Sequence, residues 1–235
     1  LHYYLLNGEP FFKETPDPKG SSTPVGTQLP VQRIKMAPGE VVLFKMLNGN
    51  SANLMPIVVD GHDVHLIAMD GVNLTEVRTI PASTGTAGSG ASSSGASSDL
   101  SATYGGQILL APANRAEFMI KANTTPGVYK IRQVAHDEQH LPSPGKVIAE
   151  IEVTGDPKEM VLPKSLPTPS REYPLMKAED VKRVRTINFG VVAPGVINKT
   201  VGVDFVINNA LYSEREVPTV VNLGDVEEWH LSVGG

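Results

Sequence analysis

The chain has 235 residues, is 40% hydrophobic and carries a formal net charge of −5 at pH 7. This length and composition support one large or two small domains with a substantial core, and the slightly acidic balance argues against a nucleic-acid-binding protein. The absence of cysteine excludes a disulfide framework and any thiolate metal site within these residues. No apolar run approaches the roughly 20 residues that span a bilayer, so we expect neither a nucleic acid nor a membrane as a partner.

The beginning of the chain combines a strand pattern with a Pro-rich stretch. Residues 1–6 predict a strand, which Asn7-Gly8-Glu9-Pro10 ends as a turn. Residues 11–30 contain several Pro, Gly and Ser, so we expect an irregular surface connection there. Leu1 lies almost inside the strand pattern, and no initiating Met or signal peptide precedes it. We therefore expect upstream sequence to be missing.

Residues 31–71 hold the clearest pattern of the chain. Apolar residues alternate with polar ones in short runs, and Pro38-Gly39 is a turn signal between the first two runs. Because period-two alternation buries one face of each strand, the pattern predicts part of a β-sandwich. The predicted strands are Val31–Met36, Val41–Leu47, Leu54–Val59 and Val64–Met69.

Further strands follow a low-complexity segment. Residues 82–103 are almost wholly Ser, Gly, Ala and Thr, which offer too little apolar surface to offset the entropy of ordering, so a mobile loop is expected. No segment before residue 155 has a convincing helical pattern, and the predicted class is therefore all-β. The remaining predicted strands of this part are 76–80, 106–110, 115–121, 128–134 and 146–153.

A Pro-rich linker is predicted to separate two domains. We expect the first domain at residues 1–155, the linker at 156–184 with a short helix at 177–183, and a second module at 185–235. Strands are predicted in that module at 185–191, 203–208 and 226–233. So few strands cannot close a sandwich core, so we expect the module to be incomplete.

The second module repeats features of the first. Tyr4-Leu5-Leu6-Asn7-Gly8 resembles Phe205-Val206-Ile207-Asn208-Asn209, and the apolar strand after Pro38-Gly39-Glu40 resembles the strand after Leu223-Gly224-Asp225. The two features follow in the same order in both modules, separated by a spacer. The repeat therefore predicts two successive sandwiches of the same kind.

The order and spacing of these motifs resemble the middle domain and the start of the third cupredoxin domain of a laccase-like multicopper oxidase. The match extends over the whole chain. The motifs that carry it are Leu6-Asn7-Gly8-Glu9-Pro10-Phe11, Pro38-Gly39-Glu40, Asp60-Gly61-His62 with Ala68-Met69-Asp70-Gly71, Gln107 to Glu117, and Val206-Ile207-Asn208-Asn209 with Leu223 to Trp229.

The resemblance implies a cupredoxin-like Greek-key β-sandwich followed by an incomplete one. It implies an oxidase that couples one-electron oxidation of a small-molecule or metal-ion reductant to four-electron reduction of dioxygen to water. The intact protein would contain copper in a type 1 centre and a trinuclear type 2/3 centre, and would lie in the extracellular space or the periplasm. Its partners would be the first domain and the rest of the third, in the same or other chains.

The copper ligands of such oxidases lie outside the part that this chain resembles. They occur in His-x-His pairs of the first domain and in two His-rich motifs of the third, one with the type 1 Cys. The first of these, His-Pro-x-His, follows the strand that ends here at Trp229–Gly235. We therefore expect no catalytic, cofactor-binding or metal-binding residue in this chain, and the chain alone to be inactive.

Imidazole binds copper well, so the histidines of the chain are candidate copper ligands. His62 and His65 fall on opposite faces of a strand entry, which favours surface or rim positions. His136 and His140 would share a face in a helix, but the following Pro-Ser-Pro-Gly favours a loop. His2 and His230 are isolated on strands.

Other groupings also favour structural interpretations. Glu227 and Glu228 alternate faces and are expected to be solvated, and Ser92–Ser94 has no nearby His or Asp partner for nucleophilic catalysis. Five methionines are dispersed at inward-facing strand positions, which favours core packing over a cuprous-ion site. They are Met36, Met46, Met55, Met69 and Met119.

One alternative from a different class remains open at this stage. A non-enzymatic extracellular tandem β-sandwich, used for adhesion or ligand binding, would have the same strand pattern. His-x-His pairs before Leu1 and a His-Pro-x-His motif after Gly235 would favour the oxidase. A small blue-copper electron carrier is excluded, because its copper needs a cysteine ligand and the chain has no cysteine.

Overall fold

The computed structural model describes residues 2–15, 25–51, 53–83, 107–138, 141–167, 176–192, 204–215 and 219–234. Strands make up nearly all of their regular structure, and the only helix among them is the single 3-10 turn η1 (Ala178–Asp180), which confirms the all-β prediction. Contacts divide the chain into two compact units, Leu1–Ser170 and Arg171–Gly235.

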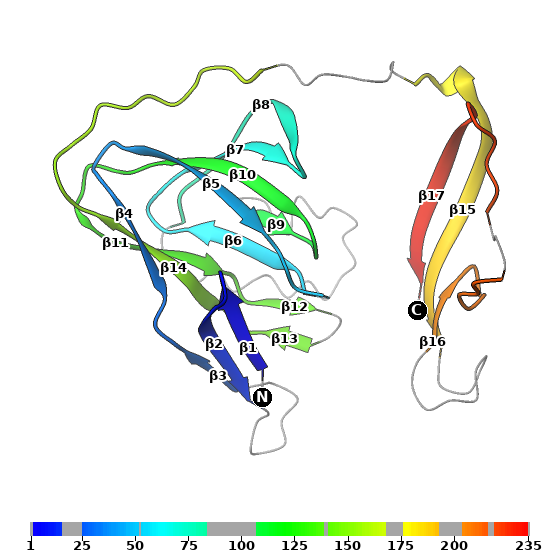
Figure 1. Ribbon diagram of the computed structural model, residues 1–235, viewed down its shortest axis with the longest axis horizontal. Coiled ribbons are helices and arrows are strands. Elements are labelled where there is room, and N and C mark those ends of the chain that lie inside the picture. Colours follow the sequence, from blue (N-terminus) through cyan, green and yellow to red (C-terminus); the bar gives the residue numbers. More distant parts are fainter. Residues whose placement is uncertain are drawn as a thin grey trace. The chain divides into compact units, whose positions relative to one another are not determined.

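The first unit is built on two sheets (Figure 1). Their strands are antiparallel except for β4 and β14, which run parallel. One sheet has the order β5 (Val41–Leu47), β10 (Arg115–Lys121), β7 (Val64–Met69) and β8 (Val72–Ile80). The other has the order β4 (Gln32–Met36), β14 (Lys146–Val153), β11 (Gly127–Gln133), β6 (Met55–Val59) and β9 (Ile108–Leu110).

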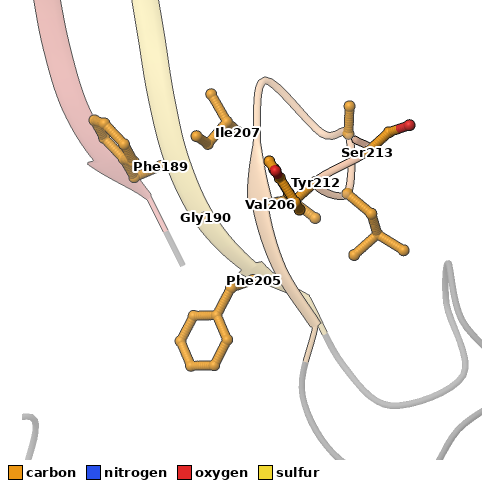
Figure 2. Close-up of a pocket in the computed structure, with 9 residues that line it drawn as sticks. Phe189, Gly190, Phe205, Val206, Ile207, Tyr212 and Ser213 are labelled. Atoms are coloured by element: carbon orange, nitrogen blue, oxygen red, sulfur yellow. The ribbon is translucent and has the colours of Figure 1, made fainter. Parts of the chain in front are cut away.

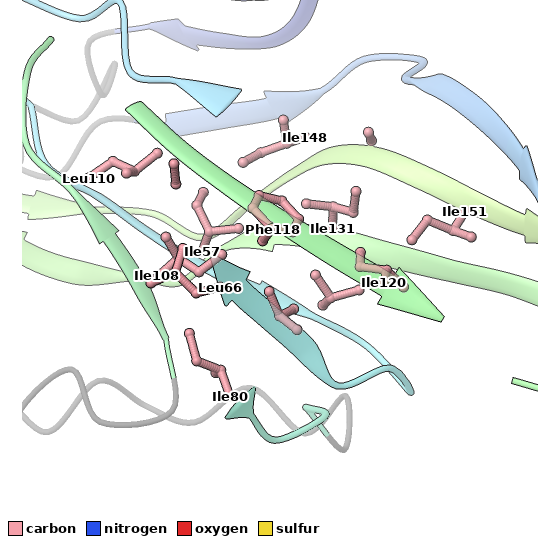
Figure 3. Packing of buried hydrophobic residues seen from close by; sticks show 14 of the residues in the cluster. Ile57, Leu66, Ile80, Ile108, Leu110, Phe118, Ile120, Ile131, Ile148 and Ile151 are labelled. Atoms are coloured by element: carbon pink, nitrogen blue, oxygen red, sulfur yellow. The ribbon is translucent and has the colours of Figure 1, made fainter. Parts of the chain in front are cut away.

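Side chains from both sheets form one hydrophobic core (Figure 3). On β10, the alternate residues Ala116, Phe118 and Ile120 are buried, as period-two patterning requires. Phe118 is fully buried and stacks on Phe44 with ring centroids 5.4 Å apart. The predicted sandwich is therefore present, with its core between the sheets.

Four of the five methionines pack in or beside this core. Met36 is 1% exposed, and Met46, Met55 and Met69 pack partly buried against the core cluster. The prediction that these four residues serve core packing is confirmed. Met119 is buried on β10 but does not belong to the core cluster.

The prediction of an irregular connection over residues 11–30 was wrong. β1 (His2–Leu6), β2 (Glu9–Thr15) and β3 (Val25–Gln28) form a three-stranded antiparallel sheet. Phe11 and Phe12 are buried and belong to the core. The composition misled because the prolines and glycines of residues 11–30 were averaged with the two short segments that form β2 and β3.

Two shorter elements also differ from expectation. β8 begins at Val72, four residues before the predicted strand start at Glu76. A small hairpin of β12 (His136–Glu138) and β13 (Leu141–Ser143) stands where a polar loop was expected. Most of the predicted mobile loop at 82–103 lies outside the described residues.

The start of the predicted linker packs against the turn that joins β4 to β5. Thr154 and Lys158 donate backbone hydrogen bonds to Met36 and Pro38 at 2.9 and 2.8 Å, and the ammonium of Lys158 lies 2.5 Å from a carboxylate oxygen of Glu40. Residues 154–158 therefore belong structurally to the first unit.

The second unit contains one small sheet. Its order is β16 (Asp204–Ile207), β15 (Val181–Val192) and β17 (Val226–Gly234), with β17 parallel to β15 and β16 antiparallel to it. The predicted helix at 177–183 was wrong beyond η1, because residues 181–183 begin β15. The β-branched Val181 and Val184 favour that extended conformation.

The turns of the sequence repeat have matching backbone conformations. The pair Asn7–Gly8 has φ angles of 51° and 88°, and Asn208–Asn209 has 51° and 64°. Gly39 and Gly224 have φ angles of 74° and 88°. Positive φ is costly for most residues but tolerated by Gly and Asn. The same residue types therefore serve the same local geometry in both units.

Candidate functional site

His62 is the histidine whose position differs most from expectation. It is 2% exposed, so the prediction of a surface or rim position was wrong. Its Nδ1 lies 2.9 Å from the backbone oxygen of Asp60, and its ring meets the edge of Tyr129 at 4.6 Å and 86°. The sequence signal for this burial is the preceding Asp60-Gly61 turn, which lets the imidazole contact the backbone carbonyl two residues earlier.

The other described histidines do not converge on a site. His65 is half-buried on β7, with Nδ1 3.1 Å from the hydroxyl of Thr79. His136 lies in β12 with Nδ1 3.0 Å from the carbonyl of Val134. His2 is exposed, and His140 lies outside the described residues. His230 is exposed and contacts Glu228 at 2.6 Å on the same strand.

A partly buried ion pair lies close to His62 in the sequence. Arg132 on β11 donates to both carboxylate oxygens of Asp60 at 2.6 to 3.1 Å and to the hydroxyl of Ser83 at 3.0 Å. Its side chain is 15% exposed and that of Asp60 is 18% exposed. Because water screens such a pair poorly, the contact fixes the end of β6 against β11.

A second ion pair lies on the sheet of the second unit. Arg185 donates to both carboxylate oxygens of Glu227 at 2.6 and 2.9 Å, and the indole of Trp229 donates to the same carboxylate at 2.9 Å. These bonds, that of Arg185 foremost, lower the pKa of Glu227 to about 2. The expectation of a solvated carboxylate was therefore wrong for Glu227, whose side chain is 8% exposed, whereas Glu228 is 55% exposed.

A pocket in the second unit is apolar (Figure 2). Side chains of β15, β16 and the following residues line it, among them Phe189, Val206, Ile207 and Leu211. Tyr212 and Ser213 supply its hydroxyls, but no carboxylate, imidazole or amine lines it. Such a lining suits apolar packing and gives no general base or metal ligand.

One face of the same sheet exposes apolar side chains. Paired residues of neighbouring strands point to the same face, so the register places these side chains together. Exposed apolar residues that share one face in this way are typical of an interaction surface. Its members are Phe189, Val191, Phe205, Ile207, Trp229, Leu231 and Val233, which are 40 to 89% exposed.

The described residues offer no ready metal centre. Among them, no three His, Cys, Asp or Glu side chains gather closely enough to hold an ion. Nor does any helix in these ranges have the length and apolar character that crossing a membrane requires. What the described part of the chain provides is a packed sandwich, the two ion pairs Asp60–Arg132 and Glu227–Arg185 with low exposure, and an exposed apolar sheet face.

The chain is similar to multicopper oxidases in part of its sequence and in its fold. The multicopper oxidase family model matches residues 2–87. No curated protein matches the chain. Among solved structures, a multicopper oxidase from Campylobacter jejuni described as a metallo-oxidase is 20% identical with a TM-score of 0.55, covering 86% of this chain and 38% of that one.

Two further solved structures agree. A bacterial laccase-like multicopper oxidase from Ochrobactrum sp. is 13% identical with a TM-score of 0.59, covering 87% of this chain and 40% of that one. A multicopper oxidase from Pediococcus acidilactici is 15% identical with a TM-score of 0.55, covering 86% and 33%. The chain thus spans well under half the length of these proteins. The family match over residues 2–87 and the shared fold therefore make the chain similar to a segment of a multicopper oxidase, with a cupredoxin-like fold.

Proposed function

We propose that this chain is the structural middle of an enzyme that takes single electrons from a reducing substrate and reduces dioxygen to water. The family match over residues 2–87 carries this proposal. In the intact protein, copper in a type 1 centre and a trinuclear centre would supply the redox chemistry. The described residues do not fit a copper site, so their part is to build and position the scaffold.

The proposed domain assignment follows from the two units. Residues 1–155 would form the second domain of the oxidase, 156–184 the linker, and 185–235 the first strands of the third domain. The matching φ angles of the Asn7–Gly8 and Asn208–Asn209 turns support two modules of one kind. The contacts of residues 154–158 with the first unit indicate that the free part of the linker starts later.

The apolar face of the β16-β15-β17 sheet supports the third-domain assignment. In a β-sandwich, such a face packs against a second sheet about 10 Å away. Phe205 and Leu231, at 74% and 64% exposed, are the size and type of residue that fill this space. We propose that the remaining strands of the third domain cover them.

The substrate would be a small-molecule or metal-ion reductant, with dioxygen as the acceptor. The location would be extracellular or periplasmic. The apolar pocket around Phe189 and Leu211 contains no charged group, so it would be part of the domain core and not a reductant site.

The test uses the full-length protein that contains this chain, loaded with copper. The proposal expects a blue absorbance at about 600 nm, bleached by a reductant without oxygen and restored by dioxygen. A tandem β-sandwich used only for binding would show no such band. Absence of the band in a copper-loaded, folded protein would overturn the oxidase proposal.

A further inference from the structure

The turn Asp60–Asp63, between β6 and β7, holds the residues that follow β8. The amide of Gly61 donates to the carbonyl of Ser83 at 3.0 Å, and the amide of Ser83 donates to the carbonyl of Val59 at 3.0 Å. The carboxylate of Asp63 accepts the amide of Ala82 at 2.8 Å. Residues 82 and 83 are therefore attached to the first unit through this turn, through Val59 of β6 and through the bond from Arg132 to the hydroxyl of Ser83.

His62 is the buried centre of the turn. Since the carbonyl oxygen of Asp60 can only accept, the 2.9 Å contact requires a proton on Nδ1. In the neutral imidazole, Nε2 then carries a lone pair. This atom is buried and has no hydrogen-bond partner among the described residues. A neutral ring therefore fits, whereas protonation would place a buried N–H opposite no acceptor.

The charged groups near the ring do not compensate for that burial. Asp60 commits its carboxylate to Arg132, and Asp63 commits one oxygen to the amide of Ala82. On β11, the hydroxyl of Tyr129 donates to the loop at Asn123 and Thr125. The charge of Asp63 and the bond to Asp60 favour the imidazolium, but burial outweighs both and lowers the pKa of His62.

We propose that His62 is an acid-sensitive switch for the Asp60–Asp63 turn: protonation of its imidazole opens the turn and releases Ala82 and Ser83 from β6. The sign follows from proton linkage. An opened turn exposes the ring to water, where it binds a proton more readily than in the closed turn, so the closed state loses stability as pH falls below the ordinary histidine value of about 6.5.

The size of the effect follows from the same linkage. If the closed turn binds no proton at pH 5, the open population rises about 30-fold between pH 7.5 and pH 5, since the open ring titrates at about 6.5. The ion pair of Asp60 with Arg132 is not itself expected to break, because neither side chain needs to change its charge. Opening is therefore local to residues 60–63 and 82–83.

The test is NMR-detected hydrogen exchange of the full chain at pH 7.5 and pH 5, corrected for intrinsic exchange rates. The protection factors of the Gly61 and Ser83 amides should fall at the lower pH, by up to about 30-fold. The amide of Ala113, bonded to the carbonyl of Asn48 at 2.8 Å, lies far from any histidine in the sequence and should keep its protection.

Two variants separate the switch from a general acid effect. His62→Asn retains a side-chain donor for the Asp60 carbonyl but cannot titrate, so protection of Gly61 and Ser83 should become independent of pH. His65→Asn, on the adjoining strand, should leave the wild-type response intact. Unchanged wild-type protection between the two pH values would overturn the proposal. So would a response that persists in His62→Asn, and if that variant fails to fold, the wild-type measurement decides alone.

Discussion

Neutralising Asp60 should destabilise the first unit far more than neutralising an exposed carboxylate. Asp60→Asn leaves the guanidinium of Arg132, 15% exposed, without its counter-charge. Losing one member of a buried pair costs about 3–5 kcal/mol, and the residual exposure here reduces the expected cost to about 2–4 kcal/mol. Glu117→Gln is the matched control, since the Glu117–Lys45 pair is 28% and 68% exposed and should contribute at most about 1 kcal/mol.

The assay is urea unfolding of the full chain, followed by far-ultraviolet circular dichroism and by tryptophan fluorescence. Trp229 is the single tryptophan and lies in the second unit, so its fluorescence monitors that unit alone. Asp60→Asn should shift the dichroism transition of the first unit and leave the fluorescence transition unchanged.

A double-mutant cycle decides whether the pair itself is responsible. Arg132→Met removes the charge partner, and the cost of the double variant with Asp60→Asn should fall short of the sum of the single costs by about 1–3 kcal/mol. Additive costs would refute the assigned coupling, and so would an Asp60→Asn variant as stable as Glu117→Gln.

Three further changes test packing, backbone and pH. Phe118→Ala should cost about 3–5 kcal/mol in urea unfolding, because its fully buried ring leaves a cavity; a loss under about 1 kcal/mol would contradict the core. Gly8→Ala should cost about 1–2 kcal/mol because its φ is positive. Gly39→Ala should cost more, because φ is positive there too and the added Cβ would press against the carbonyl of Lys158. Equal costs would contradict that contact. Glu227 has a lowered pKa of about 2, so it stabilises the folded state at pH values above the ordinary carboxyl pKa of about 4.3. This contribution is lost as pH falls towards 2. Glu227→Gln should therefore flatten the dependence of tryptophan fluorescence on pH between these two values.

The positions of the sandwich strands along the chain were largely predictable from the sequence. Alternation from Val41 to Leu47 and from Arg115 to Lys121 is strong, and these segments are β5 and β10 with the bounds expected. Turn residues such as Gly39 reinforced the pattern, because their positive φ is a local property. Alternation and turn residues are local features, so they can be recognised in a single sequence.

The N-terminal sheet could not be predicted from the sequence, because the composition averaged over residues 11–30 hid two short strands. Phe11 and Phe12 are apolar neighbours that break simple alternation, yet both are buried. Both rings contact Tyr4 on β1, but another partner is distant in the sequence: the ring of Phe12 lies 5.2 Å from the ammonium of Lys146. A contact across more than a hundred residues leaves no periodic signal in the sequence around it.

Side-chain environments at the candidate sites were also beyond reach. The burial of His62 depends on Tyr129, and the low exposure of Glu227 depends on Arg185. In both cases the partner comes from a different strand, and strand alternation gives only the face of a residue, not what packs on it. The sequence did show the repeated turn motifs, because the turn residues Asn7-Gly8 and Asn208-Asn209 recur in the same order relative to the following Gly turns, and their φ angles match.

Copper content tests the central claim most directly. The full-length protein containing these residues, and the 235-residue chain alone, would each be incubated with copper, dialysed exhaustively and analysed by inductively coupled plasma mass spectrometry. The account predicts tightly bound copper in the full-length protein and none retained by the shorter chain. A folded full-length protein that retains no copper, or a shorter chain that retains stoichiometric copper, would contradict it.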